Sequence, residues 1–289
     1  MTTPTENTRL SGLRTVLFTP ADQPQLVEKA ANSSADAVCL DLEDAVAAEA
    51  KVSARQNLYR AAAVLAEAGK CLLVRVNSEL ECLGADLAAL PPSCQAVILP
   101  KTQGKLHLTL VAAALERMAE RSASCQVQLI GMVEDPAALA ELEQPGGFHP
   151  RVAALTLGAE DLAATLHCLP ESPLIHHSFY RLAQVAHRHQ LALWGYPGSI
   201  AEFRDLPKLA ATVRLGQQAG ASAALCIHPA QLSVVRQVFV PETALTAWAT
   251  AVVAAFEQAE QQGQAVVAVD GKMVDRPVYL QALAIIKAT

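Results

Sequence analysis

Aromatic residues are scarce in this chain: Phe, Trp and Tyr together make up 4% of its 289 residues. The sequence also has no lysine- and arginine-rich run, and its formal net charge is −6. Proteins that bind nucleic acid use a basic surface, often interleaved with stacking aromatic side chains, so nucleic acid is not expected as a partner. Since 52% of the residues are hydrophobic but few of them are aromatic, the core must be filled mainly by Ala, Leu and Val, which suits helices packed closely on a parallel sheet.

Long apolar runs are missing as well. Residues 1–12 are polar and turn-rich, unlike a signal peptide, and no segment approaches the length of a transmembrane helix. The seven cysteines are an odd number, and none forms a C-x-x-C pair, so we expect reduced thiols, mostly in the core, rather than disulfides or a thiolate metal site. The composition therefore predicts a soluble, cytoplasmic protein with no membrane partner.

Neither G-x-G-x-x-G nor G-x-x-x-x-G-K-[ST] occurs, so no nucleotide-binding turn marks the switch point of a doubly wound sheet. That fold remains the alternative to a closed barrel. Eight short, mostly continuous apolar segments alternate with helical periodicity, as in strands that are buried on both faces. They are residues 15–19, 37–40, 71–76, 96–99, 127–133, 152–157, 191–194 and 223–227. This alternation predicts an α/β fold, a (β/α)₈ TIM barrel.

More chain follows the eighth strand than a barrel needs. We assign residues 1–240 to the barrel and 241–289 to a C-terminal extension of helix, hairpin and helix. The extension should contain a helix over about 245–262, a hairpin turning at Asp270-Gly271, and a last helix that Asp275 opens. Such a segment cannot bury its apolar face alone, so we expect it to pack on a barrel, that of a neighbouring subunit being favoured.

Function in such a barrel collects where the strands end. Several of the polar residues at these ends are acidic; the candidates are Asp41, Glu43, Asp44, Arg75, Asn77, Lys101, Glu134, Glu160, Asp161, Tyr196 and His228. Carboxylates facing one small mouth would raise each other's pKa unless a cation lay among them. An all-oxygen site with few nitrogen donors suits Mg²⁺, or Mn²⁺, better than zinc.

Some of these residues have a simpler explanation. Asp135, followed by Pro136, is typical of a helix N-cap, which leaves Glu134 at the end of an apolar strand as a candidate ligand. Asp161 and its neighbour Glu160 could equally be first-turn acids that complement a helix dipole.

The remaining candidates also stay open. The pair Glu43 and Asp44 could be a solvated helix start. Arg75, between apolar residues, requires an anion, which could be the substrate or a carboxylate of the DLEDAV segment. His228, before a proline, is more typical of a turn or core histidine than of a catalyst.

In order along the chain stand LRTVLFTPAD, ADAVCLDLEDAV, LLVRVNS, VILPKT, IGMVEDP, LGAEDLAATL, CIHPAQL and DGKMVDRPVYLQA. With these motifs the sequence resembles, over nearly its whole length, the citrate lyase β-subunit-like family within the HpcH/HpaI-type aldolases. The resemblance implies that Glu134 and Asp161 bind Mg²⁺ and that Glu134 also borders the substrate. It further implies that Arg75 and Arg14 contact substrate.

The family resemblance also assigns the supporting acids and the tail. It implies that Glu43 and Asp44 support the waters of the metal. The C-terminal extension is expected to cross to the next subunit, usually of a homotrimer, where Asp275 serves as the catalytic acid/base.

The activity implied by the resemblance is cleavage of a carboxylated 3-hydroxyacyl-CoA of the citramalyl, malyl or citryl type to acetyl-CoA and a 2-oxo acid. A metal would lower the pKa of the substrate hydroxyl, Arg75 would stabilise the enolate oxygen, and Asp275 would protonate the enolate carbon. The alternatives are a malyl-CoA thioesterase or malate-synthase-like condensing enzyme, and a non-catalytic subunit that assembles with an acyl-carrier protein.

The chain departs from the family pattern at three places. Ala223 and Ala224 stand where Gly-Lys is common, and the Ala-Arg-Ser-Arg run after GAEDL keeps only its last arginine, Arg181. The seventh strand ends in Leu193-Trp194 where Ile-Asp is usual. These departures leave the expected metal site intact and point to a different acyl pocket or thioester path.

Overall fold

The computed structural model describes residues 10–122, 127–239 and 243–287. The expectation for residues 1–12 thus falls largely outside the described residues, as do Cys125 and the expected boundary at 240/241. The other six cysteines are free thiols. The chain forms two compact units, residues 1–236 and 237–289.

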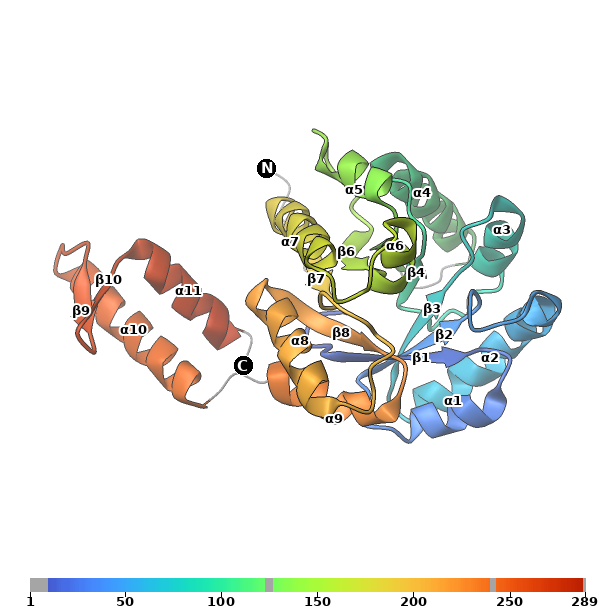
Figure 1. The fold of residues 1–289 in the computed structure, drawn as a ribbon, viewed down its shortest axis with the longest axis horizontal. Helices are drawn as coiled ribbons and strands as arrows, with labels where there is room; N and C mark the ends of the chain where they lie inside the picture. Colours follow the sequence, from blue (N-terminus) through green and yellow to red (C-terminus); the bar gives the residue numbers. More distant parts are fainter. Residues whose placement is uncertain (1–9, 123–126, 240–242, 288–289) are drawn as a thin grey trace. The chain divides into compact units, whose positions relative to one another are not determined.

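The first unit is a closed barrel of eight parallel strands, β1 to β8, each hydrogen-bonded to its neighbours in chain order (Figure 1). The strands are β1 Thr15–Pro20, β2 Ala37–Asp41, β3 Cys71–Arg75, β4 Ala96–Leu99, β5 Gln128–Val133, β6 Val152–Leu157, β7 Ala192–Trp194 and β8 Ala221–Cys226. The sheet closes because β1 also pairs in parallel with β8. This confirms the (β/α)₈ barrel and excludes the doubly wound alternative.

Helices cover the outside of the barrel (Figure 1). They are α1 Pro24–Ala31, α2 Lys51–Glu67, α3 Leu80–Ala88, α4 Lys105–Ser122, α5 Pro136–Glu143, α6 Ala159–Thr165, α7 Pro173–Arg188, α8 Leu206–Gln218 and α9 Pro229–Phe239. Several begin with proline in the first turn, where its missing N–H costs nothing. A 3-10 turn, Ala48–Ala50, directly precedes α2.

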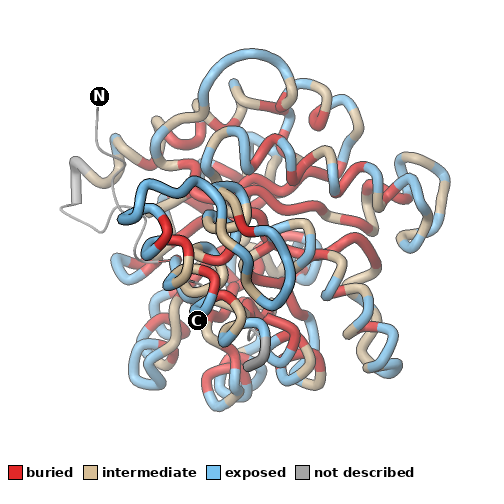
Figure 2. The backbone as a smooth tube through the Cα atoms, turned by 90° about the vertical axis from the view of Figure 1, so that its left-hand side faces the viewer, coloured by how far each residue is buried: buried red, intermediate tan, exposed pale blue. Residues whose placement is uncertain are grey.

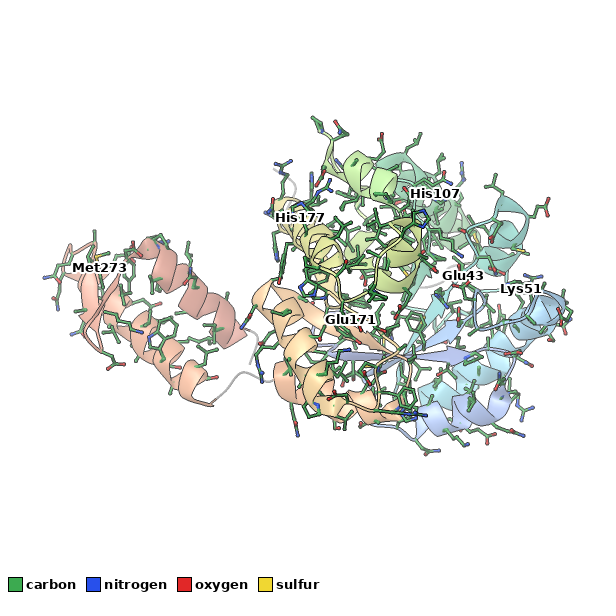
Figure 3. All side chains as sticks on the ribbon, viewed as in Figure 1. Glu43, Lys51, His107, Glu171, His177 and Met273 are labelled. Carbon is green, nitrogen blue, oxygen red and sulfur yellow. The ribbon has the colours of Figure 1, made fainter. Side chains whose placement is uncertain are left out.

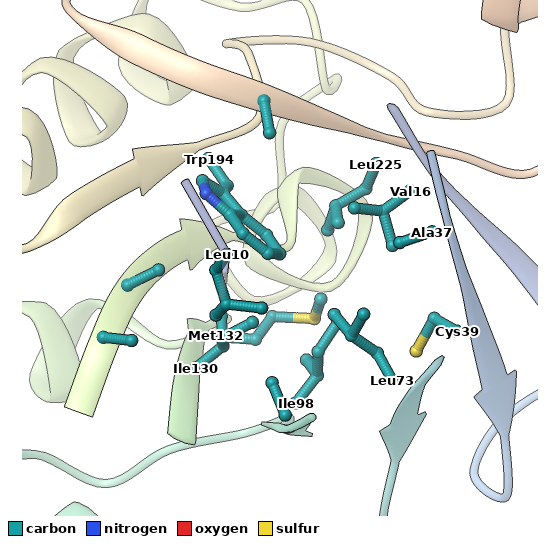
Figure 4. Close-up of a cluster of buried hydrophobic side chains, with 14 residues drawn as sticks. Leu10, Val16, Ala37, Cys39, Leu73, Ile98, Ile130, Met132, Trp194 and Leu225 are labelled. Carbon is teal, nitrogen blue, oxygen red and sulfur yellow. The ribbon is translucent and has the colours of Figure 1, made fainter. Parts of the chain in front are cut away.

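The barrel interior is filled by side chains rather than left open (Figure 4). Trp194 is 1% exposed and lies among Met132, Ile130 and Leu225. In the sheet Trp194 pairs with Ala223, so a large side chain on β7 faces a small one on β8. Two of the departures from the family pattern thus occur at neighbouring positions, where their volumes compensate. The strands are buried over most of their length, whereas many connecting turns are exposed (Figure 2).

The second unit contains α10 Thr243–Gln261, a two-stranded antiparallel hairpin of β9 Val267–Val269 and β10 Lys272–Val274, and α11 Arg276–Lys287. Positive φ angles of 50° at Asp270 and 74° at Gly271 fit the type I′ turn expected from the sequence. A small core holds α10, α11 and the hairpin together, with the rings of Phe256 and Tyr279 stacked 4.8 Å apart. In the described residues, no helix is long and apolar enough to span a membrane.

Candidate active site

A cavity of about 410 Å³ opens at the carboxyl ends of the barrel strands. Its walls carry five carboxylates and one guanidinium: Asp41, Asp44, Glu134, Glu160, Asp161 and Arg75. Apolar side chains from β1, β5, β6 and β8 and from the loops after β7 and β8 also line it. The strand ends that the sequence marked as polar therefore converge on one mouth, as the barrel topology requires.

Arg75, the last residue of β3, is held by two acids. Its Nε and Nη2 donate to the two carboxylate oxygens of Asp41 at 2.7 and 2.5 Å, and its Nη1 lies 2.9 Å from Glu43 Oε2. Burial alone would lower the pKa of Arg75, but the hydrogen bonds and charge of Asp41, with the charge of Glu43, raise it. The anion that the sequence required thus comes from the DLEDAV segment, and Arg75 still lines the cavity.

Lys101 connects this network to Glu134. It has a positive φ of 49° just after β4, a conformation that few residues other than glycine adopt. In this geometry its backbone N–H donates to Glu134 Oε2 at 2.6 Å, while its Nζ lies 2.5 Å from Glu43 Oε1. One residue therefore fixes two carboxylates that come from different strands.

Glu43 is placed by its own loop as well. It is 3% exposed and follows β2, beside the start of α2 (Figure 3). The Nζ of Lys51 donates to the backbone carbonyls of Leu42 and Glu43 at 2.9 and 3.0 Å. Burial raises the pKa of Glu43, and Arg75 and Lys101 act against that shift. The idea of a solvated helix start fails for Glu43, whereas the side chain of Asp44 is 55% exposed.

Glu134 is the most perturbed acid of the cavity. It is 5% exposed, and burial raises its pKa to about 8, with the Lys101 N–H lowering it and the charges of Glu43 and Asp161 raising it further. Gly158 leaves room for it, since a Cβ there would lie 2.5 Å from Glu134 Oε1. The carboxyl of Glu134 therefore sits in a space shaped for it, among other negative charges.

The acids next to Glu134 and Asp161 in the sequence serve the structure. Asp135 caps α5 by accepting from the N–H groups of Ala137 and Ala138 at 2.7 and 3.3 Å, as the sequence indicated. Glu160 accepts a hydrogen bond from Ser199 Oγ at 2.5 Å. Asp161 lines the cavity and makes no side-chain hydrogen bond within the described residues. This difference favours Asp161 over Glu160 as the acid available to a ligand.

The donor set fits Mg²⁺ with water and substrate as further ligands. Across the described ranges, no three His, Cys, Asp or Glu side chains are arranged to enclose a metal. Mg²⁺ is commonly held by one or two carboxylates and keeps several waters or substrate oxygens. Glu134 and Asp161 provide two such groups, and the raised pKa of Glu134 shows how strongly its charge is disfavoured without a cation.

Two residues of the first unit that the sequence singled out, Arg14 and His228, do not line the cavity. Arg14 precedes β1, and its Nη1 donates to the carbonyl of Ser222 at 3.3 Å, at the amino-terminal end of the barrel. His228 stacks on Phe203 at 4.6 Å and accepts from a backbone N–H in its own turn. Asp275 belongs to the second unit, where it caps α11 by accepting from Val278 N at 3.2 Å.

The sequence placed Asp41 and Lys101 among the candidates at strand ends without assigning a specific contact to either. Asp41 accepts hydrogen bonds from Arg75, and its Oδ1 also accepts one from the N–H of Glu43 at 2.9 Å. The available indication for Asp41 was its position directly after an apolar run, as the first residue of DLEDAV. The left-handed backbone of Lys101 leaves no trace in the sequence.

With this geometry in view, the chain can be compared with known proteins. The model of the HpcH/HpaI aldolase/citrate lyase family matches residues 14–229. The chain belongs to this family, as the resemblance implied.

Several curated relatives cover almost the whole chain. A citrate lyase subunit β-like protein of Deinococcus radiodurans is 33% identical, over 93% of this chain and 95% of its own. A (3S)-malyl-CoA thioesterase of Cereibacter sphaeroides is 32% identical, over 91% and 89%. An L-malyl-CoA/β-methylmalyl-CoA lyase of the same species is 28% identical, over 95% and 93%. Relatives with similar sequence identity to this chain thus carry the names of different activities.

Among solved structures, the protein CitE of Mycobacterium tuberculosis, in complex with magnesium, acetoacetate and coenzyme A, is similar with a TM-score of 0.75. It is 26% identical and covers 97% of this chain and 98% of its own. The fold is therefore shared over both units of the chain, and a protein of this fold binds both magnesium and a CoA molecule.

Proposed function

We propose that the protein is a Mg²⁺-dependent carbon–carbon lyase that cleaves a carboxylated 3-hydroxyacyl-CoA of the citramalyl, malyl or citryl type to acetyl-CoA and a 2-oxo acid. The observation that carries the proposal is Glu134, a buried acid in a cavity rich in carboxylates, whose pKa is raised to about 8. A cation beside Glu134 would return it to the ionised form. The magnesium and coenzyme A complex of the similar Mycobacterium tuberculosis protein supports this choice of ligands.

In this proposal Glu134 and Asp161 hold the metal. When bound, Mg²⁺ supplies a positive charge for the substrate's hydroxyl and carboxylate oxygens, which eases loss of the hydroxyl proton. Glu43, held by Arg75 and Lys101, and the exposed Asp44 accept hydrogen bonds from waters at the site. Mn²⁺ has similar ligand preferences and could substitute.

Arg75 and Asp275 act on the substrate. Arg75 lines the cavity and offers its positive charge and remaining N–H groups to the substrate, where it stabilises the enolate oxygen. Asp275 returns a proton to the carbon of the enolate formed when the bond breaks. Because Asp275 lies in the second unit, we propose that a neighbouring subunit of a homotrimer supplies it. The extension of each chain would then complete the site of another chain.

A second candidate is hydrolysis of the thioester, which the similarity to a (3S)-malyl-CoA thioesterase favours. The same residues would hold the same acyl-CoA, but water would attack the thioester carbonyl. The products separate the two activities. A lyase releases a 2-oxo acid and keeps the thioester as acetyl-CoA, whereas a thioesterase releases a free thiol and a hydroxydicarboxylate.

The deciding experiment incubates the purified protein and Mg²⁺ with citramalyl-, malyl- and citryl-CoA and measures 2-oxo acid and free thiol in parallel. We expect 2-oxo acid to appear with at least one substrate, to depend on Mg²⁺, and to vanish in Glu134→Gln. Thiol release without 2-oxo acid would replace the lyase by the thioesterase. Neither product with any of the three substrates, or full activity in EDTA, would contradict the proposal.

A further inference from the structure

Two buried hydroxyl groups line the cavity outside the acidic network. Thr156 of β6 is 0% exposed and Tyr196, just after β7, is 5% exposed. Neither Thr156 Oγ1 nor Tyr196 Oη has a hydrogen-bond partner within the described parts of the chain. Buried hydroxyls are normally paired, so two unpaired ones on one cavity wall indicate a polar group of a ligand.

The fold holds these two residues in place. Gly195 turns the chain after β7 with a φ of 96°, and its N–H donates to the Ala223 carbonyl at 2.8 Å. A Cβ at Gly195 would lie 3.2 Å from Thr156 Oγ1, so Thr156 lies directly against this turn. Gly216 of α8 packs on the other side, where a Cβ would lie 2.5 Å from the Gly195 carbonyl oxygen and 3.0 Å from Tyr196 Cα. Tyr196 therefore has little freedom to move away.

The charges on this wall differ from those on the wall of Arg75. In an eight-stranded barrel in chain order β7 lies opposite β3, so Tyr196 and Arg75 belong to opposite sides of the mouth. Of the described residues that line the cavity, Arg75 is the one cation, and each of its three nitrogens is already within 2.9 Å of an Asp41 or Glu43 oxygen. A carboxylate of the substrate at Tyr196 would meet the negative charge of Glu160.

An uncharged acceptor oxygen suits this wall instead. Burial first, and then the charges of Cys226 and Glu160, raise the pKa of Tyr196 above its ordinary value, so its hydroxyl stays protonated and can donate. A carboxylated 3-hydroxyacyl-CoA has three kinds of acceptor: the carboxylate, the hydroxyl and the thioester carbonyl. The first two are used on the metal side in the proposed function, which leaves the carbonyl.

We infer that the hydroxyls of Tyr196 and Thr156 donate hydrogen bonds to the thioester carbonyl oxygen of the substrate, and that Tyr196 shares the stabilisation of the enolate oxygen with Arg75; this rests on the proposed function. In the cleavage, the hydroxyl oxygen loses its proton and forms the carbonyl of the 2-oxo acid. The electron pair of the broken carbon–carbon bond forms the carbon–carbon double bond of the enolate, and the thioester carbonyl pair moves onto its oxygen. The enolate carbon then takes up one proton, so acetyl-CoA forms with no net change in protons.

The inference is tested by binding, which needs no turnover. Acetyl-CoA and S-ethyl-CoA, which lacks the carbonyl oxygen, are titrated into the full chain with Mg²⁺ present. We expect the wild-type protein to bind acetyl-CoA about threefold to tenfold tighter, as one or two neutral hydrogen bonds would give. Tyr196→Phe and Thr156→Val should each reduce this ratio, and together bring it to about one. Tyr59→Phe, an exposed tyrosine on α2, should leave the ratio unchanged, and Thr156→Ser should retain it.

A kinetic measurement follows the enolate itself. In D₂O the enzyme should exchange the methyl protons of acetyl-CoA, and Tyr196→Phe should lower this rate and kcat for cleavage by about 10² while KM changes little. Equal binding of the two ligands by the wild-type protein, or a ratio that survives Tyr196→Phe, would overturn the inference while leaving the lyase proposal standing. Failure of the wild-type protein to bind either CoA compound would overturn both.

Discussion

The two ends of the barrel each hold a partly or fully buried acid, and they treat it in opposite ways. At the amino-terminal end, Asp36 accepts hydrogen bonds from Thr15 Oγ1 and from the N–H groups of Arg14 and Thr15, all within 3.0 Å, and pairs with Arg236 at 2.6 Å. Burial raises the pKa of Asp36, but these four donors outweigh it and hold the pKa below its ordinary value. At the carboxyl end, Glu134 has one backbone donor and acidic neighbours, and its pKa rises to about 8.

The two acids therefore have different roles: Asp36 stabilises the fold, whereas Glu134 is available to a ligand. The amino-terminal acid joins the starts of β1 and β2 to α9, and its charge is satisfied by the chain itself. The chain does not satisfy the ionised form of the carboxyl-end acid, so Glu134 holds its proton unless a cation lies beside it. In a (β/α)₈ barrel the two ends can diverge in this way because the strands separate them. Substitutions at the two ends should therefore have different consequences.

The largest effect is expected at Glu134. Glu134→Gln keeps the shape and an acceptor for the Lys101 N–H but removes the charge that we assign to the metal, as Asp161→Asn does for the other ligand. We expect each to lower Mg²⁺-stimulated kcat by about 10³ or more while the fold is retained. Turnover with Mg²⁺ and circular dichroism check this. Substantial Mg²⁺-dependent activity in either variant would remove that residue from the metal site.

The raised pKa gives Glu134→Gln a second consequence, on stability. The folded chain holds the Glu134 proton more tightly than the unfolded chain, whose pKa is near 4.5. The free energy of unfolding contributed by this group is thus fully present below pH 4.5 and is lost as the pH rises to about 8. In EDTA at pH 8, Glu134→Gln should therefore be more stable than the wild-type protein, by about 1–3 kcal/mol, and no more stable at pH 4. Denaturant unfolding at both pH values measures this. A variant that is less stable at pH 8 would contradict the assignment.

A slightly smaller effect is expected at Asp275, where capping and proton transfer compete. Asp275→Asn and Asp275→Ser both keep a capping oxygen, so a cap alone predicts normal activity. If Asp275 is the catalytic acid, kcat should instead fall by about 10² in both variants. The matched control is Asp205→Asn, because Asp205 caps α8 through Lys208 N at 3.0 Å with the same Asp-x-Pro spacing. Loss of activity in the control as well would indicate a general effect of the caps.

Mixing variants tests whether the residue comes from a neighbouring subunit. Inactive Asp275→Asn chains and inactive Glu134→Gln chains should regain activity once their subunits exchange, because some sites would then combine an intact barrel with an intact extension. No recovery despite demonstrated exchange would place the extension on its own barrel.

A moderate effect is expected at Arg75. Arg75→Lys keeps the positive charge but loses the two-pronged contact with Asp41 and the pairing with Glu43. We expect kcat/KM to fall at least about tenfold, roughly 1.4 kcal/mol of transition-state stabilisation. Arg181→Lys is the matched control, since Arg181 makes the same two-pronged contact with Glu143 on the surface. An unchanged kcat/KM in Arg75→Lys would reduce this arginine to a structural ion pair.

Much of the fold was readable because buried parallel strands leave continuous apolar runs. Every strand lies where such a run was found, with ends shifted by two residues at most. The hairpin of the extension was equally clear, because Asp270 and Gly271 together satisfy a type I′ turn. The 3-10 turn before α2 was not predictable, because a 3-10 turn and an α-helix share the same residue preferences over three residues.

The candidate site was predictable as a set of strand ends, but not in its internal pairing. Sequence alone left open whether Arg75 faces a substrate or a carboxylate, and only the barrel brings Asp41 to it from the neighbouring strand. Arg14 shows the converse. It stands beside an apolar strand like the other candidates, yet it precedes that strand and so lies at the wrong end of the barrel. Which end of a strand a residue flanks carries the information in a parallel barrel.

The smallest effect on activity is expected at the opposite end of the barrel, from Asp36→Asn. The substitution removes a charge that four donors satisfy, so it should lower the free energy of unfolding by about 1–2 kcal/mol at pH 7, while kcat/KM stays within about twofold. Because the pKa of Asp36 is lowered from 3.8 in the fold, its contribution is present above about pH 3.8 and is lost as the pH falls through the folded value. The difference in the free energy of unfolding between the wild-type protein and Asp36→Asn should therefore become smaller in acid. The difference for Glu134→Gln also becomes smaller in acid, but at pH 8 it has the opposite sign, because there the variant is the more stable protein. Denaturant unfolding of both variants across pH measures this. The control is Glu143→Gln, at a part-exposed ion pair, which should lower the free energy of unfolding by under about 1 kcal/mol. A tenfold loss of kcat/KM in Asp36→Asn would mean that the two ends of the barrel are coupled after all.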